Sequence, residues 1–182
     1  MPMRKLLLSL LILITSLPTS AFAMGSGDPY LDAKTGLTYS LYKPVNTLNM
    51  SQTKFQLLPC GGGGEEWVYT RFSKAKKKIE IMQSMKGTHC SDPGLSVKLP
   101  SVKINGVSAS LFAYCDPTNT SAAKKCSTKD ISRVGGYLLF KLPGYYGMKA
   151  TNVQVQVLGG ITYSQLISVA RSLTPASTKP SN

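Results

Sequence analysis

The side chains best suited to covalent chemistry are four cysteines and one histidine. The cysteines are Cys60, Cys90, Cys115 and Cys126, and His89 directly precedes Cys90. A thiolate–imidazole pair needs convergent side chains, whereas neighbouring residues on an extended chain point to opposite sides. A zinc site would use C-x-x-C pairs or histidine partners at short spacing, and the cysteines here are widely spaced. The sequence therefore predicts structural disulfides in place of a nucleophile or a metal site.

The glycine run Gly61–Gly64 suggests a phosphate-binding loop, but the residues that follow it do not fit. A P-loop continues with Lys and Ser or Thr at the start of a helix, whereas Glu65, Glu66 and Trp67 lead into a strand-like segment here. The two carboxylates would repel phosphate, and as neighbours they diverge too far to act as an acid–base pair. No G-x-S-x-G motif is present. We therefore expect a non-enzyme with no catalytic, cofactor or metal residues, and a flexible loop at the glycines.

Lysines form the more suggestive group. Four of them crowd one expected hairpin end and two lie between the last two cysteines: Lys74, Lys76, Lys77, Lys78, Lys124 and Lys125. If these loops share an edge of the sheet, they form a basic rim for phosphate or sulfate groups, with lysine acting as a point charge of modest specificity. The alternative is a solvated hairpin tip that only keeps the protein soluble.

Aromatic residues near turns are the second candidate surface. Tyr145 and Tyr146 follow an expected strand and Pro143. Paired tyrosines on a turn can stack on sugars or bases, although they can also fold back over the end of the sheet. Trp67 and Tyr69 share one face of a strand, and we expect them to pack in the core.

The N-terminal segment 1–23 has the layout of a secretory signal peptide. Arg4 and Lys5 precede the apolar run Leu6–Leu17, and Ala21-Phe22-Ala23 forms an A-x-A exit. A membrane anchor is the competing interpretation, but a spanning helix needs about 20 apolar residues and this run is shorter. Cleavage after Ala23 predicts a secreted or periplasmic protein with no transmembrane segment. Loss of the two basic residues lowers the net charge from +13 to +11. The remaining positive charge favours binding to anionic surfaces.

Export changes how the cysteines are interpreted, because an even number in an oxidising compartment predicts disulfides. Four cysteines allow three pairings. We favour a local Cys115–Cys126 bridge, because Asp116-Pro117-Thr118-Asn119 between them is a strong turn sequence. Cys60–Cys90 would then be the second bridge.

Most of the remaining chain has the alternation and composition of β-strands. Asn105-Gly106 is the best hairpin signal, because a type I′ turn needs positive φ at both central residues. Val153, Val155 and Val157 are expected to face inward, and Asn152, Gln154 and Gln156 outward. The strands are predicted over 38–43, 54–60, 66–73, 78–85, 97–104, 107–115, 136–142 and 152–158.

One segment is typical of a helix. Thr162 and Gln165 fit a capping box, and an apolar stripe follows at helical spacing until Pro175: Leu166, Ile167, Val169, Ala170 and Leu173. A weaker helical turn is possible over Val45–Gln52.

Together these elements predict an α+β fold, a mostly antiparallel sheet of about seven or eight strands with a C-terminal helix packed on one face. The expected organisation is a signal peptide over 1–23, an N-terminal segment over 24–37, a single domain over 38–174 and a disordered tail over 175–182.

Short motifs add a family resemblance. The segment 38–44 ends in Tyr-Lys-Pro and resembles the opening strand of a class of bacterial extracytoplasmic domains, and 79–84 (IEIMQS) is similar to its I-x-I-x-Q-S strand. The hairpin over 102–107 is similar to its V-x-V-x-G motif, and 165–173 (QLISVARSL) to its closing helix. Over 38–174 the chain thus resembles the DUF4367-like group, found in exported and membrane-anchored bacterial proteins. The resemblance implies an α+β fold in a bacterial envelope and no activity.

These observations predict a secreted or periplasmic binding module without catalysis. Its partner would be an anionic envelope polymer, a lipid surface or an envelope protein, held by the basic loops with help from the aromatic residues. No specific nucleic-acid motif is present. The first alternative is a carrier that holds a hydrophobic ligand such as a lipid in a curved sheet, and the second is a hydrolase.

Overall fold

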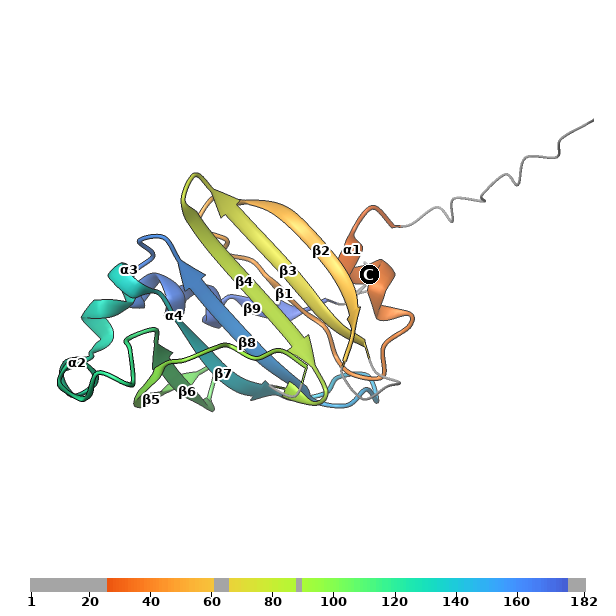
Figure 1. The fold of residues 1–182 in the computed structure, drawn as a ribbon. Helices are drawn as coiled ribbons and strands as arrows, with labels where there is room; N and C mark the ends of the chain where they lie inside the picture. Colours follow the sequence, from red (N-terminus) through yellow and green to blue (C-terminus); the bar gives the residue numbers. More distant parts are fainter. Residues whose placement is uncertain (1–25, 61–65, 88–89, 177–182) are drawn as a thin grey trace, which may run out of the picture.

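The fold is built on one seven-stranded antiparallel sheet, as the computed structural model shows (Figure 1). The structure describes residues 26–60, 66–87 and 90–176. In spatial order the strands are β2 (Ser51–Pro59), β3 (Glu66–Lys74), β4 (Lys77–Ser84), β8 (Thr151–Leu158), β7 (Gly136–Leu142), β6 (Val107–Ala113) and β5 (Val97–Ile104). The predicted α+β class and the mostly antiparallel sheet are confirmed.

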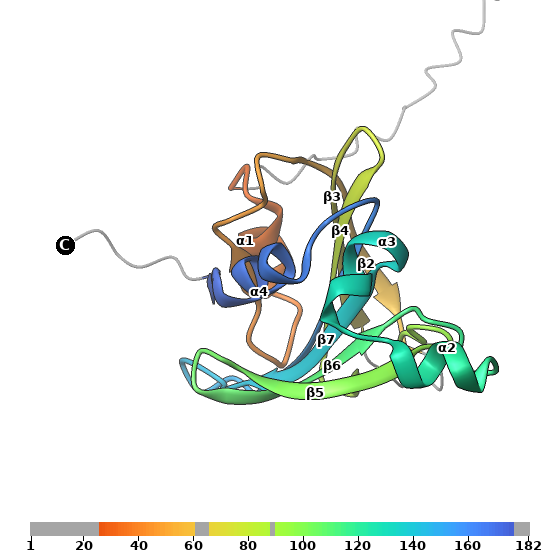
Figure 2. The same ribbon diagram turned by 90° about the vertical axis from the view of Figure 1, so that its left-hand side faces the viewer.

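One face of the sheet is covered by helices and by a small second sheet. Figure 2 shows the large sheet curving around α4 (Tyr163–Arg171), with α1 (Pro29–Lys34) on the same side. Beside them β1 (Tyr42–Pro44) pairs with β9 (Leu173–Pro175). Packing of the C-terminal helix on one face was predicted and is confirmed.

The main core lies between this face and α4. Alternate residues of the central strands point inward, so Val153, Val155 and Val157 of β8 are buried with Ile79 and Ile81 of β4. From the helix, the buried residues Leu166, Ile167, Val169 and Ala170 join the same cluster. The capping box begins α4 as predicted, because Thr162 Oγ1 accepts from the Gln165 N–H and Gln165 Oε1 accepts from the Thr162 N–H.

A second cluster joins both ends of the described chain to the sheet. Tyr30 and Ala33 of α1 pack with Leu41, Val68 and Ala176. The ordered domain therefore begins before residue 38, within the segment 24–37 that was predicted to lie outside it. The predicted disordered tail is wrong at its start, because Pro175 belongs to β9 and Ala176 is buried. The rest of that tail, 177–182, lies outside the described residues, as does the predicted signal peptide.

Two other local predictions are wrong. The segment 45–52 is no helical turn: a tight turn places Leu48 and Asn49 at φ +56° and +57°, and β2 then begins at Ser51. The strand predicted over 38–43 is shorter, since only Tyr42–Pro44 pairs along its length, with β9. The turn is held by bonds from Asn46 to Ser168 and Ser172 at the end of α4, and the short strand is set by its pairing with β9. In both places long-range contacts override local propensity.

The opposite face of the sheet mixes polar and aromatic side chains and is partly covered. Trp67 and Tyr69 lie on this face, half-buried, so the prediction that they belong to the core is wrong. Residues 90–96, which lead into β5, cross the face in front of β8 and β7 (Figure 1), where Ser91 hydrogen-bonds Gln154 and Ser96 hydrogen-bonds Tyr137. Gln154, predicted to face outward into solvent, is therefore buried.

An ion pair between the half-buried Arg71 and the buried Glu80 lies on this face. Glu80 accepts hydrogen bonds from Arg71 and Tyr69, at 2.9 and 2.7 Å. Burial and then the Glu80 hydrogen bond raise the pKa of Tyr69 to about 12. The phenol therefore stays a donor at neutral pH, and both hydrogen bonds end on Oε1 of Glu80.

The β5–β6 hairpin and both disulfides agree with the sequence prediction. Asn105 and Gly106 have φ of +48° and +86°, as a type I′ turn requires. The bridges are Cys60–Cys90 and Cys115–Cys126. Helix α2 (Thr120–Lys125) lies inside the second bridged loop and is followed by η2 (Thr128–Asp130) and α3 (Ile131–Val134).

Removing the charge of Asp28 tests how α1 is held. Asp28 caps α1 by accepting from the Tyr30 N–H and pairs with Lys43 at 2.6 Å. Burial raises its pKa, but the bonds from Lys43 and Tyr30 outweigh this and leave it below the ordinary value of 3.8. We expect Asp28→Asn, which keeps the cap, to lose no more than about 1 kcal/mol at pH 7.

A lowered carboxyl pKa stabilises the fold above the unfolded-state pKa and ceases to do so as pH falls through the folded-state pKa. Urea unfolding of the two proteins should therefore show a gap that is constant near neutrality and closes below about pH 4. A gap that persists at pH 2.5 would contradict this role for the Asp28 charge.

Candidate functional site

The two predicted lysine groups lie at the same end of the sheet. Lys78 is paired with Leu158, the last residue of β8, and Val157 is paired with Gly136, the first residue of β7. Gly136 in turn faces Ala113, the last residue of β6, two residues before Cys115. We call this end, where β3 ends, β4 begins and the 115–126 loop leaves β6, the lysine end. Figure 1 shows the β3–β4 tip, α3 and α2 along it.

The β3–β4 hairpin turns within two residues, so its lysines are held more tightly than a loose loop would hold them. Ala75 and Lys76 form the turn, with Ala75 at φ +53°. Lys74 and Lys77 are directly opposite each other in the ladder. All four lysines of the hairpin are exposed. Like charges directly across a ladder are destabilising, so the lysine end carries a repulsion that a bound anion would relieve.

An apolar groove opens beside this hairpin tip. Its volume is about 580 Å³, and it is lined by Leu48, Met50, Lys74, Ala75, Lys76, Lys77 and Gly159. Met50 belongs to the main core and Leu48 packs against it. The lysine stems extend the apolar wall while their ammonium groups reach water. We call this the lysine groove.

The turn that supplies Leu48 is held by hydrogen bonds on both sides. Asn46 Oδ1 accepts from the Leu48 N–H at 3.0 Å, and the Met50 N–H donates to the Thr47 carbonyl at 3.1 Å. Asn46 is itself bonded to Ser168 and Ser172 at the end of α4. The groove floor is therefore fastened to the C-terminal helix.

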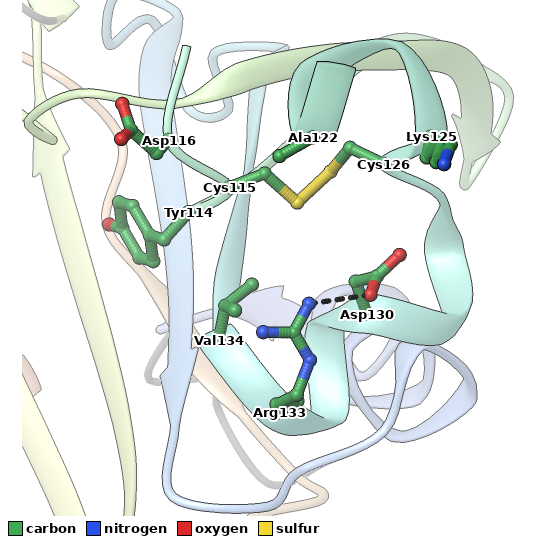
Figure 3. Close-up of a pocket in the computed structure, with 9 residues that line it drawn as sticks. All are labelled: Tyr114, Cys115, Asp116, Ala122, Lys125, Cys126, Asp130, Arg133 and Val134. Atoms are coloured by element: carbon green, nitrogen blue, oxygen red, sulfur yellow. Dashed lines mark hydrogen bonds and ion pairs between the residues drawn. A yellow bond between two sulfur atoms is a disulfide. The ribbon is translucent and has the colours of Figure 1, made fainter. Parts of the chain in front are cut away.

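A second hollow, of about 420 Å³, lies at the lysine end beside the Cys115–Cys126 bridge (Figure 3). Lys125 and Arg133 line it, but so do Asp116 and Asp130, and Arg133 pairs with Asp130 at 2.8 Å. The hydrogen bond from Arg133, followed by those from Ser127, lowers the pKa of Asp130. The charges of this hollow are thus largely compensated internally, unlike those of the lysine groove.

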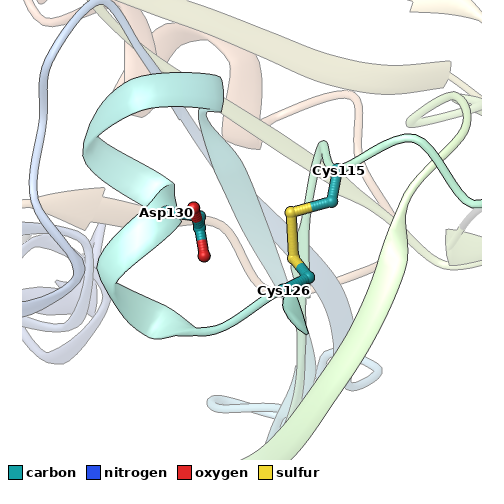
Figure 4. Close-up of side chains that lie close together, drawn as sticks. All are labelled: Cys115, Cys126 and Asp130. Atoms are coloured by element: carbon teal, nitrogen blue, oxygen red, sulfur yellow. A yellow bond between two sulfur atoms is a disulfide. The ribbon is translucent and has the colours of Figure 1, made fainter. Parts of the chain in front are cut away.

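Cys115, Cys126 and Asp130 come together closely enough to resemble a metal site (Figure 4). Metal ions bind thiolates, and both sulfurs here are joined in a disulfide. The Asp130 carboxylate already accepts from Ser127 and Arg133. The cluster is therefore explained by the bridge and by the start of η2.

The tyrosines of the predicted aromatic surface lie at the far end of the sheet, beyond the last residue of β7. Tyr145 donates to the carbonyls of Leu41 and Ala176 and so joins the two chain ends. Tyr146 is 72% exposed, with Lys34 over its ring at 5.6 Å. The aromatics and the basic hairpin occupy opposite ends of the sheet and therefore do not form one surface.

Other sequence candidates lie outside the described residues, namely His89, Glu65 and Gly61–Gly64. Leu48 and Met50 were missed. Only their pairing across space with the hairpin, through β2 and β3, brings them to the lysines. No local pattern in the sequence marks them.

Comparison with protein-family models, with curated proteins and with solved structures finds no match to this chain. The motif resemblance over 38–174 therefore stays a prediction. Among the residues that the structure describes, no helix has the length and apolar character to cross a membrane.

Glycine substitutions beside the groove test how closely its walls approach. A Cβ on Gly159 would overlap the Lys76 carbonyl, and its φ is +77°. Gly160 has a similar φ of +89° but open space around it. We expect Gly160→Ala to cost about 1–2 kcal/mol for its backbone conformation alone, and Gly159→Ala to cost about 1–3 kcal/mol more for the overlap. Equal urea-unfolding losses would contradict this close approach.

Proposed function

We propose that this protein is an exported, non-catalytic binding module that holds an anionic component of the cell envelope at its lysine end. The observation that carries the proposal is the β3–β4 hairpin, where four exposed lysines crowd one two-residue turn and two of them face each other. Such a concentration of positive charge attracts phosphate-rich or sulfate-rich partners. The net charge of +11 that remains after cleavage at Ala23 acts in the same direction.

The cysteines and the buried carboxylate support binding over catalysis. All four cysteine sulfurs are in disulfides, so they offer no thiolate nucleophile. Glu80, the buried acid among the described residues, accepts from Arg71 and Tyr69 within the sheet. The cysteines are thus joined to one another, and Glu80 Oε1 already accepts two side-chain hydrogen bonds within the sheet.

Export is the second part of the proposal. Two disulfides fit an oxidising compartment outside the cytosol. The basic start, apolar run and A-x-A exit of residues 1–23 would act as the signal peptide for export. An anionic envelope polymer or lipid surface would then be within reach.

The alternative, a carrier with a lipid inside the curved sheet, places the ligand against the concave face. Leu166, Val169 and Leu173 already fill that face, since each is buried in the main core. This occupancy favours a ligand at the end of the sheet over one inside it.

Replacing the hairpin lysines tests the proposal directly. We expect the protein that begins at Met24 to bind long-chain polyphosphate, a polyanion without an apolar part. Four neutralised charges imply that binding weakens by roughly 50-fold between about 50 and 200 mM salt. The quadruple variant Lys74→Gln, Lys76→Gln, Lys77→Gln and Lys78→Gln should lose most of the affinity and of this salt dependence.

The matched control removes four exposed lysines elsewhere, by Lys86→Gln, Lys103→Gln, Lys141→Gln and Lys149→Gln. It has the same net charge as the test variant, so it should keep most of the affinity only if position matters. Fluorescence anisotropy of labelled polyphosphate measures both. Equal losses in the two variants, or salt-insensitive binding, would overturn the proposal.

A further inference from the structure

We infer that the lysine groove holds the alkyl chain of an anionic single-chain phospholipid, with its phosphate between the lysines of the hairpin. The inference rests on the proposed function and names the ligand class of the same site. Its basis is that an apolar floor and a cluster of cations meet in one cavity. A polyanion would use the cations and leave the apolar floor exposed.

The size and lining of the lysine groove fit one alkyl chain. Its volume of about 580 Å³ falls within the roughly 300–1,000 Å³ of small-molecule sites. Leu48 and Met50 form the floor, and Met50 is an adaptable thioether side chain within the main core. An alkyl chain in the groove would cover apolar surface at a place where the main core reaches solvent.

The head group would be held by facing ammonium groups. Lys74 and Lys77 are directly opposite in the ladder, and Lys76 occupies the turn between them. Opposed residues on antiparallel strands have Cα atoms about 4.5–5.5 Å apart, so one phosphate can lie between two lysine side chains. The anion would replace lysine–lysine repulsion with attraction.

Backbone strain at Leu48 is an independent observation. A bulky residue at φ +56° is an outlier, and such strain is concentrated at ligand sites. The hydrogen bond from the Leu48 N–H to Asn46, and the bonds from Asn46 to α4, hold this conformation. They keep an apolar side chain at the groove, where the shape of the turn alone would favour glycine.

The test uses three probes and the protein that begins at Met24. Myristoyl lysophosphatidylglycerol below its micelle concentration should bind with one molecule per chain, measured by calorimetry and native mass spectrometry. Myristoyl lysophosphatidylcholine has the same tail but no net charge, and glycerophosphoglycerol has the same head but no tail. We expect each to bind at least roughly tenfold more weakly, because each lacks one of the two contacts.

Glycine variants isolate the apolar contact from folding. Leu48→Gly removes the side chain while its backbone adopts φ +56° freely, so the fold should be kept and affinity for the anionic lipid should fall roughly tenfold or more. Asn49→Gly makes the equivalent backbone change at φ +57° and should bind as the parent does. Equal losses in both variants would overturn the inference.

Lysine variants isolate the charge. Lys74→Gln with Lys76→Gln and Lys77→Gln should abolish the preference for the anionic over the zwitterionic lipid, whereas Lys103→Gln with Lys141→Gln and Lys149→Gln should keep it. Equal binding of both lipids by the parent protein would also overturn the inference.

Polyphosphate separates the two proposals. If the parent binds polyphosphate but not the lysophospholipid, only the groove assignment fails. If it binds the lipid but not polyphosphate, the groove stands and the capture of anionic polymers fails. Failure of both probes rejects both proposals.

Discussion

Burial of the apolar face shared by β4, β8 and β7 is the interaction from which the other features of the fold follow. The three central strands present alternating valine, isoleucine and leucine to one side, and α4 covers them. Burying such side chains contributes about 1.5–3 kcal/mol each, far more than any surface ion pair here. The residues that follow α4, Leu173–Pro175, lie beside Tyr42–Pro44 and pair with them.

The same packing reaches the lysine groove. The end of α4 carries Ser168 and Ser172, and both bond to Asn46. Asn46 orients the turn that puts Leu48 at positive φ, and the turn leads into β2 beside the β3–β4 hairpin. The site is thus assembled from a turn, a hairpin tip and a loop glycine, and the helix in the core sets the position of the turn. A site made this way is pre-organised, because its walls belong to elements that are rigid for other reasons.

Local signals predicted much of this fold and less of the site. The capping box of Thr162, the Asn105-Gly106 turn and the alternation in β8 each depend on residues within one turn or one strand, and each is confirmed. Both disulfides were predicted from the even number of cysteines in a chain expected to be exported and from the turn sequence after Cys115.

The incorrect predictions concern long-range contacts. Pro175 looked like a helix stop before a loose tail, but β1, near the opposite end of the described chain, offers it a partner strand. Gln154 looked exposed, but residues 90–96 cover it.

In the candidate site, too, the local features could be predicted and the long-range ones could not. The lysines are visible in the sequence because charge clusters within a few residues, and the hairpin that carries them follows from alternation. Leu48 and Met50 could not be predicted from the sequence, because they approach the lysines only through the pairing of Ser51 with Ser73 at the start of β2.

Tyr145 and Tyr146 show the reverse error. Both tyrosines looked exposed in the sequence, but the hydroxyl of Tyr145 donates to the carbonyls of Leu41 and Ala176. A chemical surface needs both a charge pattern, which is local, and a shape, which is set by strand register. Here the register adds an apolar floor to a basic tip, and this floor is why we propose a lipid-like ligand in place of a simple polyanion.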